Sequence, residues 1–233
     1  MPNSRSSSPQ RKKYGRLILL RHATSDYDPR CVPPPDPPLA THKNLRHDYR
    51  ACVAALPRDA LWYVSPLARC QATAKLLKQH GGNPKDEREA EWLREQNCGD
   101  WHGRPIAKIW QETLQALPGH NWHFTDAVTR PPNGESMTDV IARLTPHVNS
   151  LRQNLQKTAN ENIVLVTHAM VIRALLAIML NLPPDLVLGF DIQPLSVTAL
   201  TTIYNTGYNT GDSTEGDKAK GGVWRLEYLN RAY

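Results

Sequence analysis

The chain has 233 residues, of which 40% are hydrophobic and 21% are charged, and its formal net charge is +6. This composition is typical of a folded globular protein with one large or two small domains. No apolar run reaches the roughly 18–20 residues that a membrane helix needs. Basic residues are not interleaved with aromatic ones, as they are in nucleic-acid binders. We therefore expect neither a membrane span nor a nucleic-acid partner.

The first sixteen residues carry five basic side chains and no acidic one. We expect residues 1–14 to form a disordered basic tail, with contact to nucleic acid or membrane as the alternative. The tail contains no apolar core of a secretion signal, which favours a cytoplasmic location. The four cysteines show no C-x-x-C spacing and are expected as reduced, unligated thiols.

The first predicted strand is Leu17–Leu20, because an unbroken run of apolar residues is typical of a strand buried on both faces. Six prolines between Pro29 and Pro38 exclude both a helix and a central strand, so this segment is expected to be a loop. Thr41 is expected to cap a helix that runs to about Leu56.

A second strand is predicted at Leu61–Val64, and Ser65 with Pro66 is expected to begin a helix that ends near Gly81. Residues 83–134 are rich in proline, glycine and tryptophan. They are expected to form an irregular excursion over the edge of the sheet, with one short helix near 105–116.

Ser136 and Asp139 form a capping box that begins the next predicted helix, in which apolar residues recur at helical spacing up to Leu155. A strand at Ile163–Thr167 and a helix from about Met170 to Asn181 follow. Two late strands are predicted at Val197–Tyr204 and Val223–Leu229, joined by a mobile loop at 205–222.

This alternation of strands and helices favours a single α/β domain over residues 15–233. The expected architecture has three layers, α/β/α, with a mainly parallel sheet and helices on both of its faces. Antiparallel pairing is left open for the late strands.

Polar side chains follow three of the predicted strands. Arg21 and His22 follow the first strand, Arg69 lies shortly after the second, and His168 follows the strand at 163–167. The carboxyl ends of parallel strands meet at one edge of the sheet, where open α/β sheets bind their ligands. A single histidine or arginine at such a position more commonly has a structural or surface role than a role in binding a ligand. Together they predict a pocket for an anion, and the planar guanidinium of arginine suits phosphate oxygens.

Five segments of the chain resemble the motifs of one family in the right order. They are RHATS at 21–25, SPLARCQATA at 65–74, LREQNCGDWHG at 93–103, PNGES at 132–136 and VTHA at 166–169, which is followed by Arg173. They resemble the RHGxT, SPLxRaxqTA, LxExxxGxWEG, PxGES and VxHgxxiR motifs of the histidine phosphatase superfamily, the phosphoglycerate-mutase-like enzymes. The segment at 93–103 is similar to that of the phosphatase branch, which includes α-ribazole phosphatase-like and broad-specificity enzymes.

The resemblance implies a role for each matched residue. His22 would attack phosphorus and form a phosphohistidine, and Glu95 would protonate the leaving alcohol and then activate water. Arg21, Arg69 and His168 would hold the phosphoryl oxygens, so that neither a metal nor another cofactor is required. The further substrate-binding candidates are Ser25, Arg94 and Ala169.

The chain departs from the family pattern at three informative positions. Ala23 replaces a glycine, Asp28 stands where many members have an asparagine that contacts phosphate, and His102 replaces a glutamate and adds a potential cation. Asp28 must point away, or that contact is lost. The expected lining of the leaving-group side comprises His47, Arg94, Trp101, His102 and the loop from Pro29 to Pro38.

The predicted function is metal-independent hydrolysis of a small phosphomonoester. One alternative is a 2,3-bisphosphoglycerate-dependent mutase, although the ERHYG-type stretch of that branch is absent. Another is a phosphate- or phosphoprotein-binding protein with the same fold and little turnover. The identity of the alcohol and the presence of a homodimer are left open.

Overall fold

The computed structural model describes residues 15–41, 47–116, 126–157, 161–203 and 223–233. The predicted basic tail at 1–14 and the predicted loop at 205–222 lie outside the described residues. The boundaries of a single domain over 15–233 stay a prediction.

The described chain contains a six-stranded sheet in the order β3-β2-β4-β1-β5-β6. Its strands are β1 (Arg16–Arg21), β2 (Leu61–Val64), β3 (Asp86–Glu89), β4 (Asn162–Thr167), β5 (Val197–Ile203) and β6 (Val223–Arg231). The first four strands pair in parallel, whereas β5 is antiparallel to both β1 and β6. The predicted mainly parallel sheet is confirmed, and the late strands are antiparallel.

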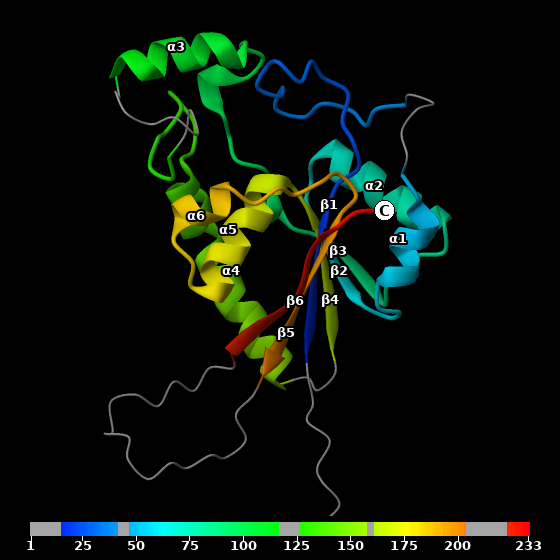
Figure 1. The fold of residues 1–233 in the computed structure, drawn as a ribbon. Helices are drawn as coiled ribbons and strands as arrows, with labels where there is room; N and C mark the ends of the chain where they lie inside the picture. The colour runs from blue at the N-terminus through cyan, green and yellow to red at the C-terminus, as the bar shows by residue number, and fades with distance from the viewer. Residues whose placement is uncertain (1–14, 42–46, 117–125, 158–160, 204–222) are drawn as a thin grey trace, which may run out of the picture.

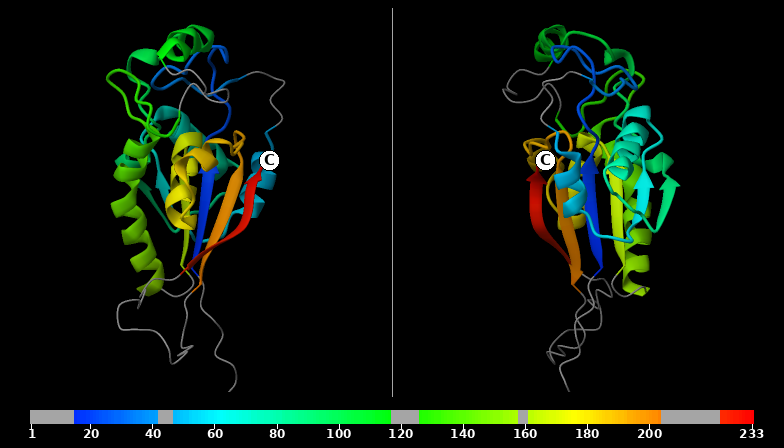
Figure 2. Two further views of the ribbon diagram at one scale, coloured as in Figure 1. Left: turned by 60° about the vertical axis from the view of Figure 1, so that its left-hand side comes forward. Right: turned by 90° about the vertical axis from the view of Figure 1, so that its right-hand side faces the viewer.

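Helices cover both faces of this sheet, as Figures 1 and 2 show. Helices α1 (Tyr49–Ala55) and α2 (Ala68–Gln79) lie on one face, and α4 (Met137–Lys157) and α5 (Ala169–Leu180) lie on the other. The strands alternate accordingly: Leu17 and Leu19 pack toward α4 and α5, while Ile18 and Leu20 pack toward α1 and α2. The predicted three-layer α/β/α architecture is confirmed.

The proline loop and the chain after β3 lie together above the carboxyl ends of the parallel strands (Figure 1). We call residues 29–38 and 91–116 the cover region; it includes two 3-10 turns, Glu91–Leu93 and Gly99–Trp101, and helix α3 (Ile106–Ala116). Its two parts are joined by hydrogen bonds from Val32 N–H to Arg104 O and from Ile106 N–H to Arg30 O, both 2.9 Å. A small apolar cluster of Val32, Trp101 and Ile109 packs between them.

The prediction of a helix beginning at Thr41 is wrong. Ala40 N–H donates to Thr24 O at 2.8 Å, which ties this part of the chain to the loop after β1. Helix α1 begins at Tyr49, and its cap is Asp48, whose carboxylate accepts from Ala51 N–H at 2.9 Å. The cap at Asp48 was not predicted, although an aspartate is as good a cap as a threonine.

Helix α2 also begins later than predicted, at Ala68 rather than at Ser65 and Pro66. The Ser65 hydroxyl lies 2.9 Å from His168 Nε2, and the capping residue Leu67 has no side-chain acceptor. Asp36 supplies the missing acceptor from the proline loop, with its carboxylate 2.8 Å from Ala68 N. A long-range contact therefore sets the start of this helix.

Two elements were not predicted, the strand β3 and the short helix α6 (Pro184–Leu188). All four residues of β3 are charged and exposed, with the sequence DERE. The strand pairs with β2 in register from Leu61 to Val64 and forms an edge of the sheet. It lacks the apolar alternation on which the prediction depends, because backbone pairing with β2 and an ion pair between Lys78 and Glu87 at 2.8 Å hold it without apolar burial.

Candidate active site

The sheet gathers the predicted polar residues at the carboxyl ends of three neighbouring strands. His22 follows β1, Arg69 lies in the first turn of α2 after β2, and His168 stands between β4 and α5. Strand β4 lies between β1 and β2, so residues far apart in sequence meet. The rings of His22 and His168 have their centroids 5.1 Å apart.

The tautomer of His22 follows from its hydrogen bonds. Its Nδ1 lies 2.7 Å from Ala23 O, and because a carbonyl only accepts, Nδ1 must carry the proton. The lone pair is therefore on Nε2, which accepts from Arg69 Nε–H at 3.3 Å. The orientation leaves Nε2 as the nitrogen able to attack an electrophile.

Arg69 connects both histidines with the proline loop. Its Nε also lies 3.2 Å from His168 Nδ1, while its Nη1 donates to Pro35 O and to Asp36 Oδ1, both at 3.1 Å. The side chain is only 5% exposed. The guanidinium is thus fixed in plane, which is what bidentate binding of an anion requires.

His168 lies deeper than His22, fully buried behind Arg69. Its Nδ1 accepts from Arg69, so its Nε2 carries the proton and donates to Ser65 Oγ at 2.9 Å. Ser65 therefore positions this ring rather than beginning a helix.

Burial and positive neighbours keep both histidines neutral. Burial, reinforced by the charges of Arg21 and Arg69, lowers the pKa of His22 to about 3. Burial also lowers the pKa of His168 well below its usual value, with His22 and Arg69 adding to the effect. At neutral pH, the His22 ring is therefore unprotonated, with a free lone pair on Nε2.

Arg21 brings a second guanidinium to the site. Its Nη1 donates to Ile192 O, and burial lowers its pKa against the opposing charge of Glu95. Its Nε is buried, and no described residue accepts from it. A buried donor without an acceptor is costly, and an anion in the cavity would satisfy it.

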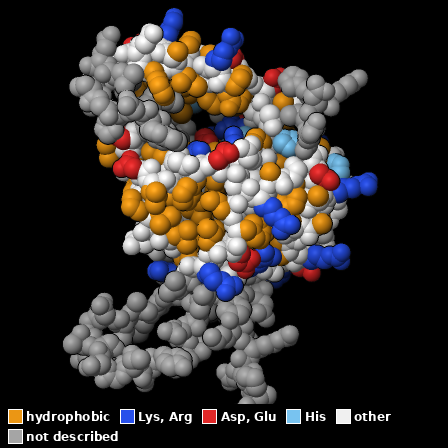
Figure 3. Space-filling model, in the orientation of Figure 1, with side chains coloured by type: hydrophobic (Ala, Val, Ile, Leu, Met, Phe, Trp, Pro, Cys, Tyr) orange, Lys and Arg blue, Asp and Glu red, His pale blue; other side chains and the backbone are white. Residues whose placement is uncertain are grey.

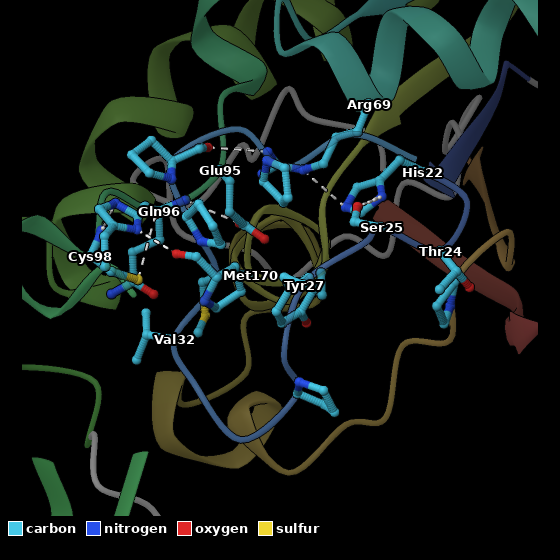
Figure 4. Close-up of a pocket in the computed structure, with 18 of the residues that line it drawn as sticks. His22, Thr24, Ser25, Tyr27, Val32, Arg69, Glu95, Gln96, Cys98 and Met170 are labelled. Atoms are coloured by element: carbon cyan, nitrogen blue, oxygen red, sulfur yellow. Dashed lines mark hydrogen bonds between the residues drawn. The ribbon is translucent and has the colours of Figure 1, made fainter. Parts of the chain in front are cut away.

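Arg21, His22 and Arg69 line a cavity of about 480 Å³ under the cover region, whereas His168 is fully buried and is not part of its lining. Figure 4 shows His22 and Arg69 toward one end of this cavity and Val32 and Cys98 toward the other, with Glu95 between them. Glu95 is close enough to Arg21 and Arg173 that its charge acts on the pKa of both. Its carboxylate thus belongs to the same cavity as His22 and the two guanidinium groups of Arg21 and Arg69.

The segment that carries Glu95 is held by the segment PNGES. Gln96 Nε2 donates to Glu135 O at 2.6 Å, and Asn97 N–H donates to Glu135 Oε2 at 3.0 Å. Gly99 has a φ of +49°, and a Cβ there would lie 2.0 Å from Pro132 O. The two motifs therefore form one unit that fixes the position of the carboxylate.

The other predicted binding residues divide into two groups. Ser25 and Ala169 line the cavity, and Ser25 Oγ lies 3.5 Å from His22 Nδ1. Arg94 does not line it, because its side chain pairs with Glu91 on the surface. His47 does not line the cavity either, and its Nε2 accepts from Thr24 N–H at 3.1 Å. The expectations for Arg94 and His47 are not met.

His102 lines the cavity, and both of its ring nitrogens bond to the protein. Its Nδ1 lies 2.6 Å from Pro33 O, and its Nε2 accepts from Cys98 N–H at 3.2 Å. Nε2 also lies 3.3 Å from Asn97 Oδ1, so both ring nitrogens are engaged within the protein. His102 therefore ties the proline loop to the segment at 98–103.

The other two departures from the family pattern are accommodated. Asp28 points away from the cavity and forms an ion pair with Arg30 at 2.8 Å, which holds the pKa of Asp28 at about 2. Ala23 is buried, its N–H donates to Thr73 Oγ1 at 3.0 Å, and it is not among the residues with a positive φ. Its methyl group therefore needs no unusual backbone conformation.

Sequence reasoning gave no role to several cavity residues. Asp36 contacts Arg69 from the proline loop, and Arg173, Cys98 and Met170 line the cavity. Only Arg173 had a signal, its place in the segment after His168. Asp36 and Cys98 follow from the placement of the cover region, which no local pattern encodes, whereas Met170 lies in the first turn of α5.

A model of the "Histidine phosphatase superfamily (branch 1)" matches residues 17–209. The chain belongs to the histidine phosphatase superfamily. This assignment confirms the resemblance read from the five motifs, which lie inside the matched range.

Relatives within the superfamily carry two kinds of name. A glucosyl-3-phosphoglycerate phosphatase of Mycolicibacterium vanbaalenii is 34% identical over 179 residues, which cover 73% of this chain and 76% of the relative. A 2,3-bisphosphoglycerate-dependent phosphoglycerate mutase of a Methylobacterium species is 27% identical over 186 residues, 76% and 86% of the two chains. The solved structure of a mycobacterial glucosyl-3-phosphoglycerate phosphatase superposes with a TM-score of 0.72 at 26% identity, and covers 94% of this chain and 100% of that one.

Two further observations concern membranes and metals. No helix in the described ranges is long and apolar enough to cross a bilayer. Within the same ranges, no three or more His, Cys, Asp or Glu side chains are grouped so that they could hold a metal ion. Independence of metals stays a prediction from the sequence.

Proposed function

We propose that this protein is a phosphomonoester hydrolase that works through a phosphohistidine on His22. The observation that carries the proposal is the state of His22: a buried, neutral imidazole whose lone pair on Nε2 lies 3.3 Å from a fixed guanidinium. An anion bound to Arg69 would bring its phosphorus close to that lone pair. The phosphatase name of the relative at 34% identity agrees with this chemistry.

In the first step, His22 Nε2 forms a bond to phosphorus while the bond from phosphorus to the ester oxygen breaks. The leaving oxygen takes a proton from the carboxyl group of Glu95 and departs as a neutral alcohol. The Nδ1–H of His22 keeps its hydrogen bond to Ala23 O, which stabilises the ring as it gains positive charge.

In the second step, Glu95 is a carboxylate and accepts a proton from water. The water oxygen bonds to phosphorus as the bond between phosphorus and Nε2 breaks, which releases phosphate and restores both residues. Arg69 and Arg21 carry the positive charge opposite the phosphoryl oxygens in both steps. Their fixed hydrogen bonds to Asp36 and Ile192 orient them beforehand.

We assign His168 the role of stabilising the phosphoryl oxygens, and this effect is transmitted through its hydrogen-bond partner Arg69. In the described state its Nδ1 accepts from Arg69 and has no proton to donate. A bound phosphate dianion would stabilise the protonated ring, so we expect proton uptake at His168 when the anion binds. The ring then adds a positive charge only while the site is occupied.

A mutase is the second candidate, because a relative with that name matches at 27% identity. The two reactions differ in where the phosphoryl group goes. Hydrolysis gives inorganic phosphate and the free alcohol, while a mutase moves the group to another hydroxyl of a sugar acid. Measuring free phosphate against transferred phosphate with 3-phosphoglycerate separates them.

The experiment that tests the proposal is hydrolysis of p-nitrophenyl phosphate by wild type and His22→Asn between about pH 5 and pH 8. We expect release of phosphate by the wild type and a loss of roughly 10⁴-fold or more in the variant, since the nucleophile is gone. The control is His80→Asn, because His80 is exposed at the end of α2 and does not line the cavity. An intact substrate with folded wild type would instead favour a binding protein with little turnover.

The natural substrate is proposed as a small phosphorylated metabolite. The cytoplasmic location and the homodimer stay predictions from the sequence.

A further inference from the structure

Much of the cavity lining is apolar, and we call this part of the lining the wall. Val32, Pro33, Pro34, Trp101, Ile106 and Met170 line it, and most of them belong to the cover region. Figure 3 shows a hollow beneath this region, with hydrophobic side chains above it and charged side chains at its base. The leaving group of a phosphomonoester bound to Arg69 would face this wall.

The proline part of the wall has little capacity for hydrogen bonds. Proline has no backbone N–H, so three consecutive prolines at 33–35 offer only carbonyl oxygens. Two of these oxygens are already used: Pro33 O lies 2.6 Å from His102 Nδ1, and Pro35 O accepts from Arg69 Nη1 at 3.1 Å. Hydroxyl groups of a sugar would lose their water here and find few partners.

Three polar side chains of the cavity lining are engaged within the protein. Gln96 Nε2 donates to Glu135 O, both ring nitrogens of His102 are bonded, and Thr24 Oγ1 lies 2.8 Å from His47 Nε2. These contacts are made within the protein, so the groups are not turned toward a ligand. Recognition of a leaving group by these three side chains would require their hydrogen bonds within the protein to break.

Positive charge for a second anionic group is limited as well. Beyond Arg21 and Arg69, the described lining contains one further arginine or lysine, Arg173. Its Nε donates to Phe190 O at 2.9 Å, and the charges of Glu95 and Asp191 act on it. A carboxylate on the leaving group would therefore meet the carboxylate of Glu95 as well as this guanidinium.

We infer that the leaving group of the preferred substrate is an apolar or aromatic body, not a sugar or a sugar acid. The inference rests on the proposed function and names the substrate class of the same site. It distinguishes this chain from what the name of its 34%-identical relative says of that protein, a phosphatase for a glucosylated phosphoglycerate.

The test compares benzyl phosphate with sn-glycerol 3-phosphate and 3-phosphoglycerate. All three esters release alkyl alcohols of similar acidity, so a difference reports contacts and not leaving-group chemistry. We expect kcat/KM for benzyl phosphate to be about 10–100-fold higher, as burial of one apolar ring predicts. An equal or higher value for either of the other two esters would overturn the inference while leaving the proposed function intact.

Variants of the wall make the test specific. Met170→Gln and Pro34→Ser each add a polar group at the wall, and should lower the preference for benzyl over glycerol ester roughly 5–10-fold. Pro38→Ser is the matched control, because Pro38 belongs to the same loop but does not line the cavity. A preference that is unchanged in both wall variants would contradict the assignment.

Binding of non-hydrolysable analogues keeps the inference testable if turnover fails. Benzylphosphonate should bind about 10–100-fold more tightly than 3,4-dihydroxybutylphosphonate, measured by calorimetry on the wild type. If neither p-nitrophenyl phosphate nor any of the three esters is hydrolysed, the proposed function is rejected, and only equal or reversed phosphonate affinities would then reject the apolar leaving group.

Discussion

At the scale of single residues, the site depends on a neutral His22 among positive charges. Its lone pair on Nε2 faces Arg69, and the opposite nitrogen is fixed by Ala23 O. The arrangement lowers the free energy of unfolding in acid, because an unfolded chain would bind a proton at this histidine far more readily than the folded one.

That difference in proton binding predicts how stability changes with pH. The pKa of His22 is about 3 in the folded protein against an ordinary value of 6.5, so between these values the unfolded state binds more protons. Stability therefore falls as pH falls below 6.5, by about 2 kcal/mol at pH 5 from this residue alone. Urea unfolding of His22→Asn should show a gain over wild type of that size between pH 7 and pH 5, and parallel pH curves would contradict the assignment.

Glu95 should matter most for esters whose alcohols leave with difficulty. Glu95→Gln removes the proton donor, and we expect losses of about 10²–10⁴-fold in kcat for benzyl phosphate but much smaller losses for p-nitrophenyl phosphate. Glu91→Gln is a suitable control, because Glu91 is exposed and pairs with Arg94 outside the cavity. Equal losses for both substrates would argue against a general acid at position 95.

At the scale of elements, the proline loop is fastened to the site by one carboxylate. Asp36 Oδ2 accepts from Ala68 N–H at 2.8 Å, and Asp36 Oδ1 accepts from Arg69 Nη1 at 3.1 Å. The loop thus caps helix α2 and orients the guanidinium through the same side chain. His102 fastens the other part of the loop through Pro33 O.

Asp36 is accordingly a positioning residue. Asp36→Asn cannot accept both hydrogen bonds with oxygen atoms, and we expect kcat/KM to fall roughly tenfold, with weaker inhibition by phosphate. Asp28→Asn, directly before this loop, is the matched control, because Asp28 is exposed and pairs with Arg30. Identical kinetics and phosphate inhibition in the two variants would reject the role of Asp36.

At the scale of the whole molecule, a parallel sheet turns distant sequence positions into one pocket. The long apolar runs predicted β1 and β4, and with them the meeting of His22 with His168. The sequence did not reveal β3, the docking of Asp36 or the surface position of Arg94. These depend on backbone pairing and long-range contacts, and neither leaves a periodic pattern in the sequence.

The measurement that tests the central claim most directly is trapping of the phosphorylated enzyme. Wild type mixed with excess benzyl phosphate and quenched in base should carry one acid-labile phosphoryl group, located by peptide mass spectrometry on His22. His22→Asn should carry none, and Glu95→Gln should still be phosphorylated by p-nitrophenyl phosphate. Steady turnover with a phosphoryl group on another residue, or without any phosphorylated enzyme in a rapid quench, would contradict the account.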